Sequence, residues 1–259
     1  MNAQTIFTKT EMLTDTPFTY CPGCTHGLAN RLIAESIDEL GRADDAIGVA
    51  SVGCSVFAYD FFNCDMQQAA HGRAPAVATG IKSVHPDNLV FTYQGDGDLA
   101  SIGIAEIIYA AARNENISVF FVNNAIYGMT GGQMAPTTLI GQKASTAQSG
   151  RDAKTNGSPI RMCELLTTLD GPAYIERVSL STPKVTRAAK KAIKKALSTQ
   201  INQAGFSFVE ILSACPTYWK MNPAEALEWI DSTMTKQYPL GVFKDEAAQY
   251  PSMEVARNA

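Results

Sequence analysis

Residues 89–124 read LVFTYQGDGDLASIGIAEIIYAAARNENISVFFVNN, and this stretch decides the fold. Leu89–Tyr93 is an apolar run that ends at a glycine turn, which is typical of a buried strand. Ser101–Arg113 has the pattern of a helix, and Ile117–Val122 is a second apolar run. The sequence therefore predicts two parallel strands joined by a helix, the repeating unit of an α/β protein with a mainly parallel sheet flanked by helices.

Polar residues follow both predicted strands at their carboxyl ends. Asp96 lies in the turn Gly95-Asp96-Gly97-Asp98, and Asn124 follows the second strand. Open α/β sheets bind ligands at this edge. Carboxylate and amide oxygens suit Mg2+ or Ca2+, and glycines let the backbone approach a phosphate closely. We expect a metal and diphosphate site here; the alternative is an ordinary crossover with an incidental glycine turn.

The turn GDGD, followed 25 residues later by NN, resembles the diphosphate-binding signature of thiamine diphosphate enzymes. The resemblance implies that Mg2+ is bound by Asp96, by the side chain of Asn124 and by the backbone carbonyl of Ile126. It also implies the fold of a thiamine diphosphate-binding domain. A glycine turn alone is weak support for this, and the pair of motifs on one strand–helix–strand unit is much more specific.

The composition argues against several classes of protein. The chain has 259 residues and a formal net charge of −4, so no basic field favours nucleic acid. No apolar run reaches the roughly 18 residues of a membrane-spanning helix, and MNAQTIFTKTEML lacks the regions of a secretory signal. We therefore expect a cytoplasmic protein. Without a repeat or a linker, we expect a single domain over residues 1–259, with a C-terminal extension from residue 217.

The chain contains six cysteines, which in an α/β protein without an export signal favour metal or redox chemistry over disulfides. Four of them lie at predicted loops, namely Cys21 and Cys24 of a CPGC motif, Cys54 of a Gly-Cys-Ser turn, and Cys215 before a proline. By spacing alone, three interpretations stay open: an iron–sulfur cluster, a zinc ion, or buried thiols without a metal. Cys64 and Cys163 have no partner at a metal-binding spacing, and we expect them in the core.

The remaining predicted elements set the frame for these motifs. In chain order they are helix Thr25–Leu40, strand Ile47–Val52, a loop over residues 57–80, a short helix Met162–Thr168, strand Tyr174–Leu180, helix Pro183–Gln203, strand Phe206–Leu212, and one helix in Pro223–Ala259 before YPLGVFKD and a polar end. Gly128–Pro159 is a long polar stretch, and loops of that length are usually functional or mobile. Because YGMTGGQ follows the Asn pair directly, we predict a loop that wraps a cofactor.

Two groups of cations have both a functional and an ordinary interpretation. Helix Pro183–Gln203 gathers basic side chains on one side, namely Arg187, Lys190, Lys191, Lys194 and Lys195. They suit an acidic electron carrier, although a solvated outer face is the more common origin of such a pattern. His71 and Arg73 flank Gly72 and suit a phosphate or a substrate carboxylate, which makes them the candidate catalytic residues. The ordinary alternative is a turn in which Arg73 pairs with a nearby carboxylate.

Several motifs in order resemble the β subunit of 2-oxoacid:ferredoxin oxidoreductases. They are CPGC, the Gly-Cys-Ser turn, HGRA, GDGD, NNAIYGMTGGQ with APTT, the late CPT and the ending YPLGVFKD. The resemblance implies a [4Fe–4S] cluster bound by Cys21, Cys24, Cys54 and Cys215. The residues that we predict around thiamine diphosphate are those of the motif turns: Gly53, Ser55, Gly95, Asp96, Gly97, Asp98, Asn124, Ile126, Gly128, Met129 and Thr130.

The resemblance also implies the reaction and the partners. Family members decarboxylate a 2-oxoacid oxidatively with coenzyme A to acyl-CoA and CO2, and they pass electrons through the cluster to ferredoxin. Thiamine enzymes bind the cofactor between two α/β domains, and this chain has room for the diphosphate side only. We therefore expect an α subunit that supplies the glutamate on the pyrimidine side, together with γ and ferredoxin-like δ subunits.

The substrate is the open question. In some relatives a lysine occupies the position of Gly132, and here no cation follows the Asn pair until Lys143. A neutral branched-chain substrate such as 2-oxoisovalerate is therefore favoured over 2-oxoglutarate. Two rival functions are a thiamine diphosphate decarboxylase or carboligase without redox chemistry, and a non-catalytic iron–sulfur or zinc protein. The four placed cysteines argue against the first rival, and the GDG and NN motifs argue against the second.

Overall fold

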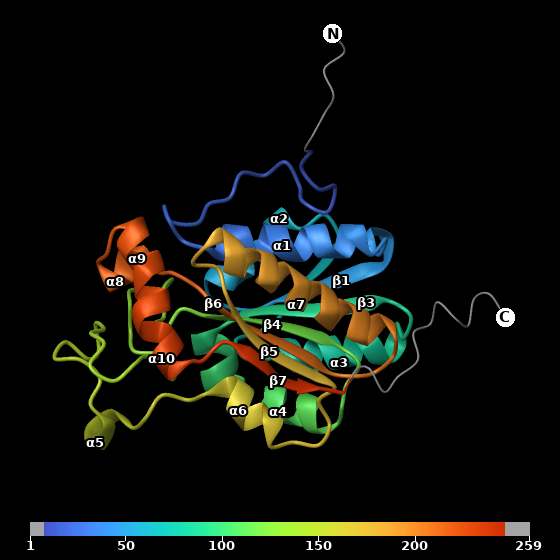
Figure 1. Cartoon of the computed structure of the whole chain (residues 1–259). Helices are drawn as coiled ribbons and strands as arrows, with labels where there is room; N and C mark the ends of the chain where they lie inside the picture. The colour runs from blue at the N-terminus through green and yellow to red at the C-terminus, as the bar shows by residue number, and fades with distance from the viewer. Residues whose placement is uncertain (1–7, 247–259) are drawn as a thin grey trace, which may run out of the picture.

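The computed structural model describes residues 8–246, which build a seven-stranded sheet covered by helices on both faces (Figure 1). The strand order is β2-β1-β3-β4-β6-β5-β7, and every neighbouring pair is parallel except β5 and β7. The strands are β1 (Ala46–Ala50), β2 (Asp65–Gln68), β3 (Leu89–Gly95), β4 (Ser118–Asn123), β5 (Tyr174–Ser179), β6 (Ser207–Leu212) and β7 (Gly241–Asp245). The predicted fold class is confirmed.

The two faces of the sheet explain why its central strands are apolar throughout. Helices α1 (His26–Glu39) and α7 (Pro183–Ile201) pack on one face, and α3 (Ala74–Val84), α4 (Ile104–Ala112) and α6 (Met162–Thr167) cover the other (Figure 1). All residues of β4 are buried, as expected for a strand covered on both sides. The two cores hold the carboxyl ends of β3 and β4 in fixed register, with Gly95 opposite Val122.

The prediction of a loop over residues 57–80 is wrong in detail. It contains the short helix α2 (Ala58–Phe61), strand β2 and the start of α3. The sequence hides β2 because it is a polar edge strand, and it hides α3 because Pro75 and small residues obscure the helical period. Pro75 lies in the first turn of α3, where a proline is tolerated. The short helix α5 (Ala153–Asn156) is the only α-helix that the structure forms within residues 128–159.

The C-terminal segment returns to the sheet. Helices α8 (Pro216–Trp219) and α9 (Pro223–Trp229) are followed by the π-helical turn η4 (Ile230–Met234), α10 (Thr235–Gln237) and β7. The single helix predicted for this region is therefore several short ones, and the GVFKD motif forms β7, antiparallel to β5. The polar end predicted after this motif lies outside the described residues.

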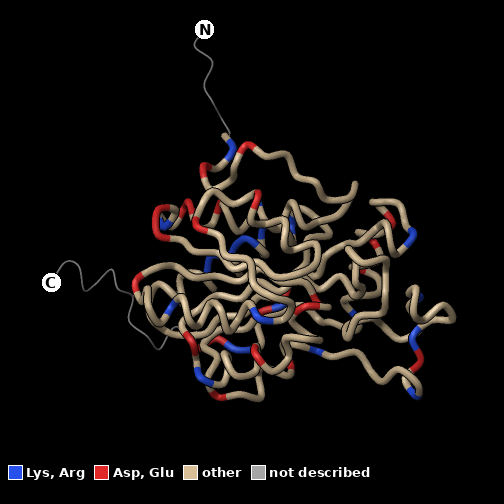
Figure 2. The backbone as a smooth tube through the Cα atoms, turned by 180° about the vertical axis from the view of Figure 1, so that it is seen from behind, with Lys and Arg blue, Asp and Glu red and all other residues tan. Residues whose placement is uncertain are grey.

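Three of the five basic side chains on this side of α7 are paired within the chain, namely Lys190, Lys194 and Lys195. Lys190 Nζ lies 2.7 Å from carboxylate oxygens of both Glu35 and Glu39 on α1, and Lys195 pairs with Asp245 on β7. Figure 2 shows both signs of charge interspersed along the backbone. These pairs favour the ordinary interpretation of the basic residues as an outer helix face. No helix within residues 8–246 is long and apolar enough to span a membrane.

Candidate active site

Asp96 and Asn124 meet at one cavity at the carboxyl edge of the sheet. Both side chains are almost fully buried, with exposures of 2% for Asp96 and 6% for Asn124. The cavity has an empty volume of about 430 Å³, which includes space open to solvent. Every residue that the sequence predicted around the cofactor lines it, and His71 does as well. We call this space the Asp96 cavity.

Two hydrogen bonds hold the Asp96 carboxylate in place. Oδ1 accepts a hydrogen bond from the Gly97 backbone at 2.8 Å, and Oδ2 accepts one from Thr137 Oγ1 at 2.5 Å. Burial nevertheless raises the pKa of Asp96 to about 7, because the charged form is poorly solvated there. A divalent cation would offset this cost, so the residues present fit a magnesium-bound diphosphate. Thr137 was missed by the sequence analysis, although it belongs to the APTT motif.

The turn after β4 has an unusual backbone. Ala125 is left-handed, with a φ of 56°, a conformation that is strained for an alanine. Asn123 Oδ1 accepts a hydrogen bond from the Ala125 N–H at 3.1 Å, and Thr138 Oγ1 donates to the Ala125 carbonyl at 2.6 Å. This left-handed turn places Asn124 and Ile126 at the cavity wall, while Ala125 stays buried.

Asp98 orients His71. The Asp98 carboxylate accepts hydrogen bonds from Ser51 Oγ at 2.8 Å, from the Gly72 N–H at 2.6 Å and from Gln94 Nε2 at 2.5 Å, and His71 Nδ1 contacts it as well. Asp98 lines the cavity, but these contacts occupy its carboxylate. Its main effect is therefore to fix the imidazole of His71 at the cavity.

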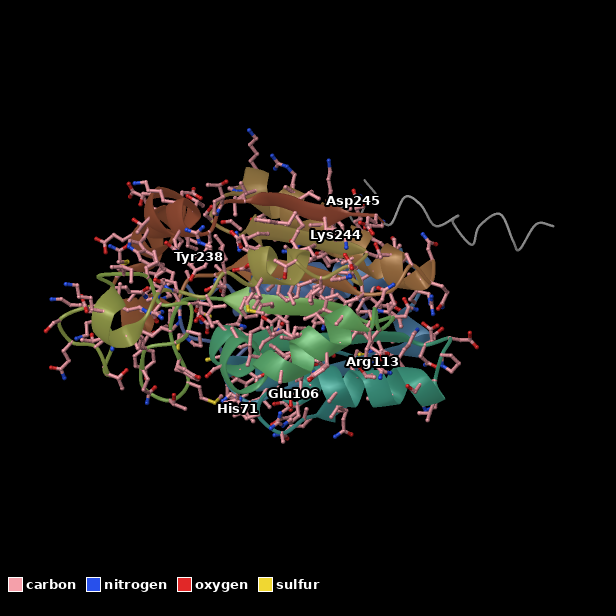
Figure 3. All side chains as sticks on the ribbon, turned by 90° about the horizontal axis from the view of Figure 1, so that it is seen from below. His71, Glu106, Arg113, Tyr238, Lys244 and Asp245 are labelled. Atoms are coloured by element: carbon pink, nitrogen blue, oxygen red, sulfur yellow. The ribbon has the colours of Figure 1, made fainter. Side chains whose placement is uncertain are left out.

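Arg73 is not brought to the cavity. Its guanidinium pairs with Glu106 of α4, and its side chain is 50% exposed. Figure 3 shows His71 and Glu106 near each other, at the side of the sheet opposite Lys244 and Asp245. This pairing is the ordinary alternative that the sequence left open for Arg73. Gly132 also lies outside the cavity wall, and a Cβ added there would come within 2.6 Å of the Tyr218 ring.

Four of the six cysteines line a second cavity, which we call the thiol cavity. These are the four predicted cluster ligands Cys21, Cys24, Cys54 and Cys215, and the empty volume is about 450 Å³. Burial raises the pKa of Cys54 to about 11 and those of Cys24 and Cys215 to about 12. Cys163 lies elsewhere in the core, where its Sγ is 3.1 Å from Glu210, and Cys64 contacts Met66.

The arrangement of the thiols bears on the kind of metal site. No group of three or more His, Cys, Asp or Glu side chains within residues 8–246 is arranged to hold a metal ion. In a zinc site, four ligands converge on one ion. An iron–sulfur cluster is larger than one ion and spreads its ligands farther apart. Four thiols around one cavity therefore fit a cluster better than a single metal.

The two cavities share a wall. His26, Cys54, Asn124 and Gly128 line both of them. A Cβ on Gly128 would lie 3.4 Å from Cys54 Sγ and 3.6 Å from Cys215 Sγ, so the glycine keeps this wall thin. His26 Nδ1 lies 2.6 Å from Tyr93 Oη, and burial lowers the pKa of the imidazole to about 4, which keeps it neutral. The sequence analysis did not single out His26, although it lies two residues after the CPGC motif.

The fold and the Asp96 cavity define a thiamine diphosphate-binding domain. The family model "Thiamine pyrophosphate enzyme, C-terminal TPP binding domain" matches residues 51–211, and the chain belongs to this family. The ketoisovalerate oxidoreductase subunit VorA of Methanothermobacter thermautotrophicus is 52% identical over 89% of this chain and 48% of its own length. The chain thus spans about half the length of this relative.

Two other comparisons cover a larger share of the matched protein. The 2-oxoglutarate synthase subunit KorB of Methanocaldococcus jannaschii is 37% identical over 83% of this chain and 77% of that protein. The 2-oxoglutarate:ferredoxin oxidoreductase structure from Magnetococcus marinus, with 2-oxoglutarate, coenzyme A and succinyl-CoA bound, has a TM-score of 0.75. The match is 25% identical and covers 98% of this chain and 90% of that one. The chain is a member of the 2-oxoacid:ferredoxin oxidoreductase subunits, as the sequence predicted.

Proposed function

We propose that this chain is the β subunit of an oxidoreductase that decarboxylates a branched-chain 2-oxoacid with coenzyme A and reduces ferredoxin. The observation that carries the proposal is the wall shared by the two cavities. One cavity suits a magnesium-bound diphosphate, and the other suits an iron–sulfur cluster. A shared wall allows electrons to pass between two such groups within one subunit.

Each group of residues has a role in this proposal. Asp96, the Asn124 side chain and the Ile126 carbonyl hold Mg2+, and the four cysteines of the thiol cavity hold a [4Fe–4S] cluster. When bound, thiamine diphosphate stabilises negative charge at the substrate carbon, and the cluster accepts single electrons. His71, which contacts Asp98, lines the cavity and serves as the candidate catalytic residue.

The proposed enzyme needs partners. An α subunit supplies the glutamate for the pyrimidine side, and γ and ferredoxin-like δ subunits complete the complex. The support is that the relatives are named as subunits of oxidoreductases or synthases. The α, γ and δ subunits, ferredoxin and coenzyme A are all part of the proposal.

We propose 2-oxoisovalerate as the substrate. The support is the 52% identity to a ketoisovalerate oxidoreductase subunit and the lining of the Asp96 cavity, where the structure puts neither lysine nor arginine among residues 8–246. A second substrate carboxylate would therefore have neither a lysine nor an arginine of the described residues beside it in this cavity. The rival, 2-oxoglutarate, is favoured by the names of the KorB relative and of the Magnetococcus enzyme. Gly132 does not line the cavity, so the absence of a lysine at this position does not support the choice of substrate.

The test begins with the complex that copurifies with this chain under anaerobic conditions. We expect stoichiometric thiamine diphosphate by mass spectrometry, an absorbance near 400 nm that bleaches on reduction, and faster acceptor reduction with 2-oxoisovalerate than with 2-oxoglutarate. Cofactor without iron would support the non-redox decarboxylase instead. Iron without cofactor would support a non-catalytic iron–sulfur protein.

A further inference from the structure

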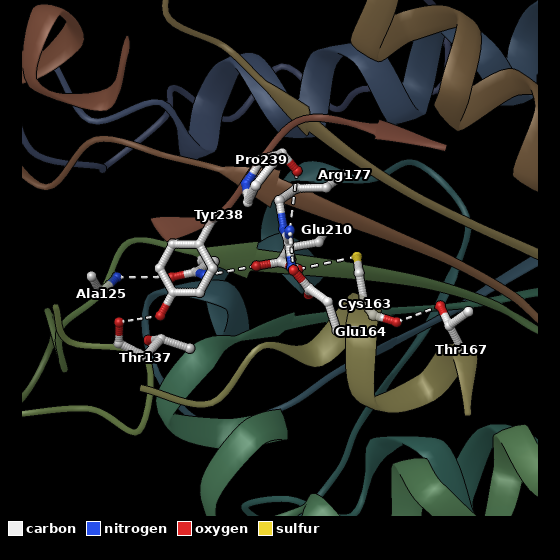
Figure 4. A network of polar contacts seen from close by, with 10 residues as sticks. Ala125, Thr137, Cys163, Glu164, Thr167, Arg177, Glu210, Tyr238 and Pro239 are labelled. Atoms are coloured by element: carbon white, nitrogen blue, oxygen red, sulfur yellow. Dashed lines mark hydrogen bonds and ion pairs between the residues drawn. The ribbon is translucent and has the colours of Figure 1, made fainter. Parts of the chain in front are cut away.

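A buried arginine lies behind the Asp96 cavity. Arg177 of β5 is fully buried, and its guanidinium contacts two carboxylates (Figure 4). Nε donates to Glu210 Oε2 at 2.8 Å, Nη2 donates to Glu164 Oε2 at 2.5 Å, and Nη1 donates to Glu164 Oε1 and to the Pro239 carbonyl, each at 3.1 Å. Because desolvation offsets most of the attraction in a buried ion pair, stability alone is a weak reason for this arrangement.

One chain of hydrogen bonds leads from Arg177 to the strained turn. Glu210, which Arg177 holds through Oε2, accepts a hydrogen bond from Asn123 Nδ2 on its other oxygen at 2.7 Å. Asn123 in turn accepts the hydrogen bond of the Ala125 N–H. The side chain that stabilises the left-handed Ala125 is therefore itself fixed by the buried ion pair. We call this chain the turn arm.

A second chain leads from Arg177 to the Asp96 carboxylate. Arg177 binds the Pro239 carbonyl, and its Cζ lies 5.4 Å from the ring centre of Tyr238. The Tyr238 hydroxyl donates to the Thr137 carbonyl (Figure 4). The Thr137 hydroxyl in turn donates to Asp96. We call this chain the carboxylate arm. It connects the segment after α10 with the floor of the Asp96 cavity.

We propose that Arg177 positions the metal ligands of the Asp96 cavity through these two arms. The turn arm sets where Asn124 and Ile126 face, and the carboxylate arm sets the direction of Asp96. The inference rests on the proposed function, because it takes Asp96 and its neighbours as the magnesium site. The planar guanidinium contacts Glu164, Glu210 and Pro239 at once, a geometry that lysine cannot reproduce.

The carboxylate arm is tested by measuring Mn2+ binding to the purified complex in the presence of thiamine diphosphate. Mn2+ replaces Mg2+ because free Mn2+ gives an electron paramagnetic resonance signal. Tyr238→Phe removes one hydroxyl and should weaken Mn2+ binding about three- to tenfold, the size of one neutral hydrogen bond. Tyr174→Phe is the matched control, since its hydroxyl contacts Glu176 on β5 and lines neither cavity. Equal Mn2+ affinity in the Tyr238→Phe and Tyr174→Phe complexes would refute this arm.

The turn arm is tested by rescue. Asn123→Ala should weaken Mn2+ binding because Ala125 loses the partner that keeps it left-handed. Adding Ala125→Gly should restore most of that affinity, since glycine adopts a positive φ without strain. If Asn123 only supports the core, the glycine will restore nothing, and the turn arm is refuted. Asp96→Asn separates this inference from the proposed function: if that variant still binds Mn2+, the site itself is wrong and both proposals fail.

Discussion

The Asp96 cavity and the thiol cavity share a wall but are built in opposite ways. The Asp96 cavity takes its central residues from two strand ends of one strand–helix–strand unit, and hydrogen bonds fix its carboxylate before any ligand binds. The thiol cavity collects cysteines from residue 21 to residue 215. Cys24, Cys54 and Cys215 are partly buried, and burial raises the pKa of each thiol. The Asp96 cavity is therefore preorganised, whereas the arrangement of the thiol cavity depends on the group that it binds.

The largest expected effect is at the preorganised site. Asp96→Ala removes the only carboxylate that we assign to Mg2+, so the complex should lose thiamine diphosphate completely. The fold should survive, because the substitution also removes a carboxylate that is costly to bury. The measurement is cofactor content by mass spectrometry together with circular dichroism. Stoichiometric cofactor in a folded Asp96→Ala complex would contradict the metal assignment.

The next effect concerns the thiol cavity. Cys215→Ser should lower the iron content and slow electron transfer to the acceptor, because serine is a poor ligand for a cluster. Cofactor content should fall much less, since the Asp96 cavity keeps its own hydrogen bonds. Cys163→Ser is the control, as this cysteine lies in the core next to Glu210. Iron loss in the control with full iron in Cys215→Ser would reverse the ligand assignment.

A smaller effect is expected for substrate choice. Met129 lines the Asp96 cavity and is 40% exposed, so Met129→Lys puts a cation there without deep burial. The ratio of kcat/KM for 2-oxoglutarate to that for 2-oxoisovalerate should rise by about tenfold or more, because a distal carboxylate gains a partner. Ile140→Lys is the control, since Ile140 is 51% exposed in the same long stretch and lines neither cavity. An unchanged ratio in Met129→Lys would place the substrate side chain elsewhere.

The contrast between the cavities also explains what the sequence could predict. Asp96 and Asn124 follow apolar runs at short spacing, so strand periodicity alone brings them to one edge. The four cysteines depend on long-range folding, and by spacing alone the sequence left cluster, zinc and plain thiols open. The roles of Thr137, Tyr238 and Arg177 could not be predicted, because they come from contacts between segments far apart in the chain. The sequence also suggested Arg73 as a catalytic residue, whereas in the structure its guanidinium pairs with Glu106.

The smallest expected effect is a pH dependence that separates the two cavities in the metal-free protein. The pKa of Asp96 is about 7 in the folded state, against an ordinary value of 3.8. Between these values the folded state binds more protons than the unfolded state, so this carboxylate lowers stability as the pH rises toward 7 and has a constant cost above it. The thiols of Cys24, Cys54 and Cys215, whose pKa values burial raises, stay protonated over this range and contribute nothing.

The measurement is the difference between the melting temperatures of chelator-treated wild-type protein and chelator-treated Asp96→Asn protein. The wild-type value should therefore fall by several degrees relative to that of the variant between pH 4 and pH 7.5. Cys54→Ser should follow the wild-type curve, because a thiol with a pKa of about 11 does not titrate there. With Mg2+ and thiamine diphosphate bound, the decline should disappear, since the cation favours the charged carboxylate. A metal-free Asp96→Asn protein whose melting temperature parallels the wild type across this range would show that Asp96 is already ionised without a cation. Preorganisation would then come from the hydrogen bonds of Thr137 and Gly97 alone.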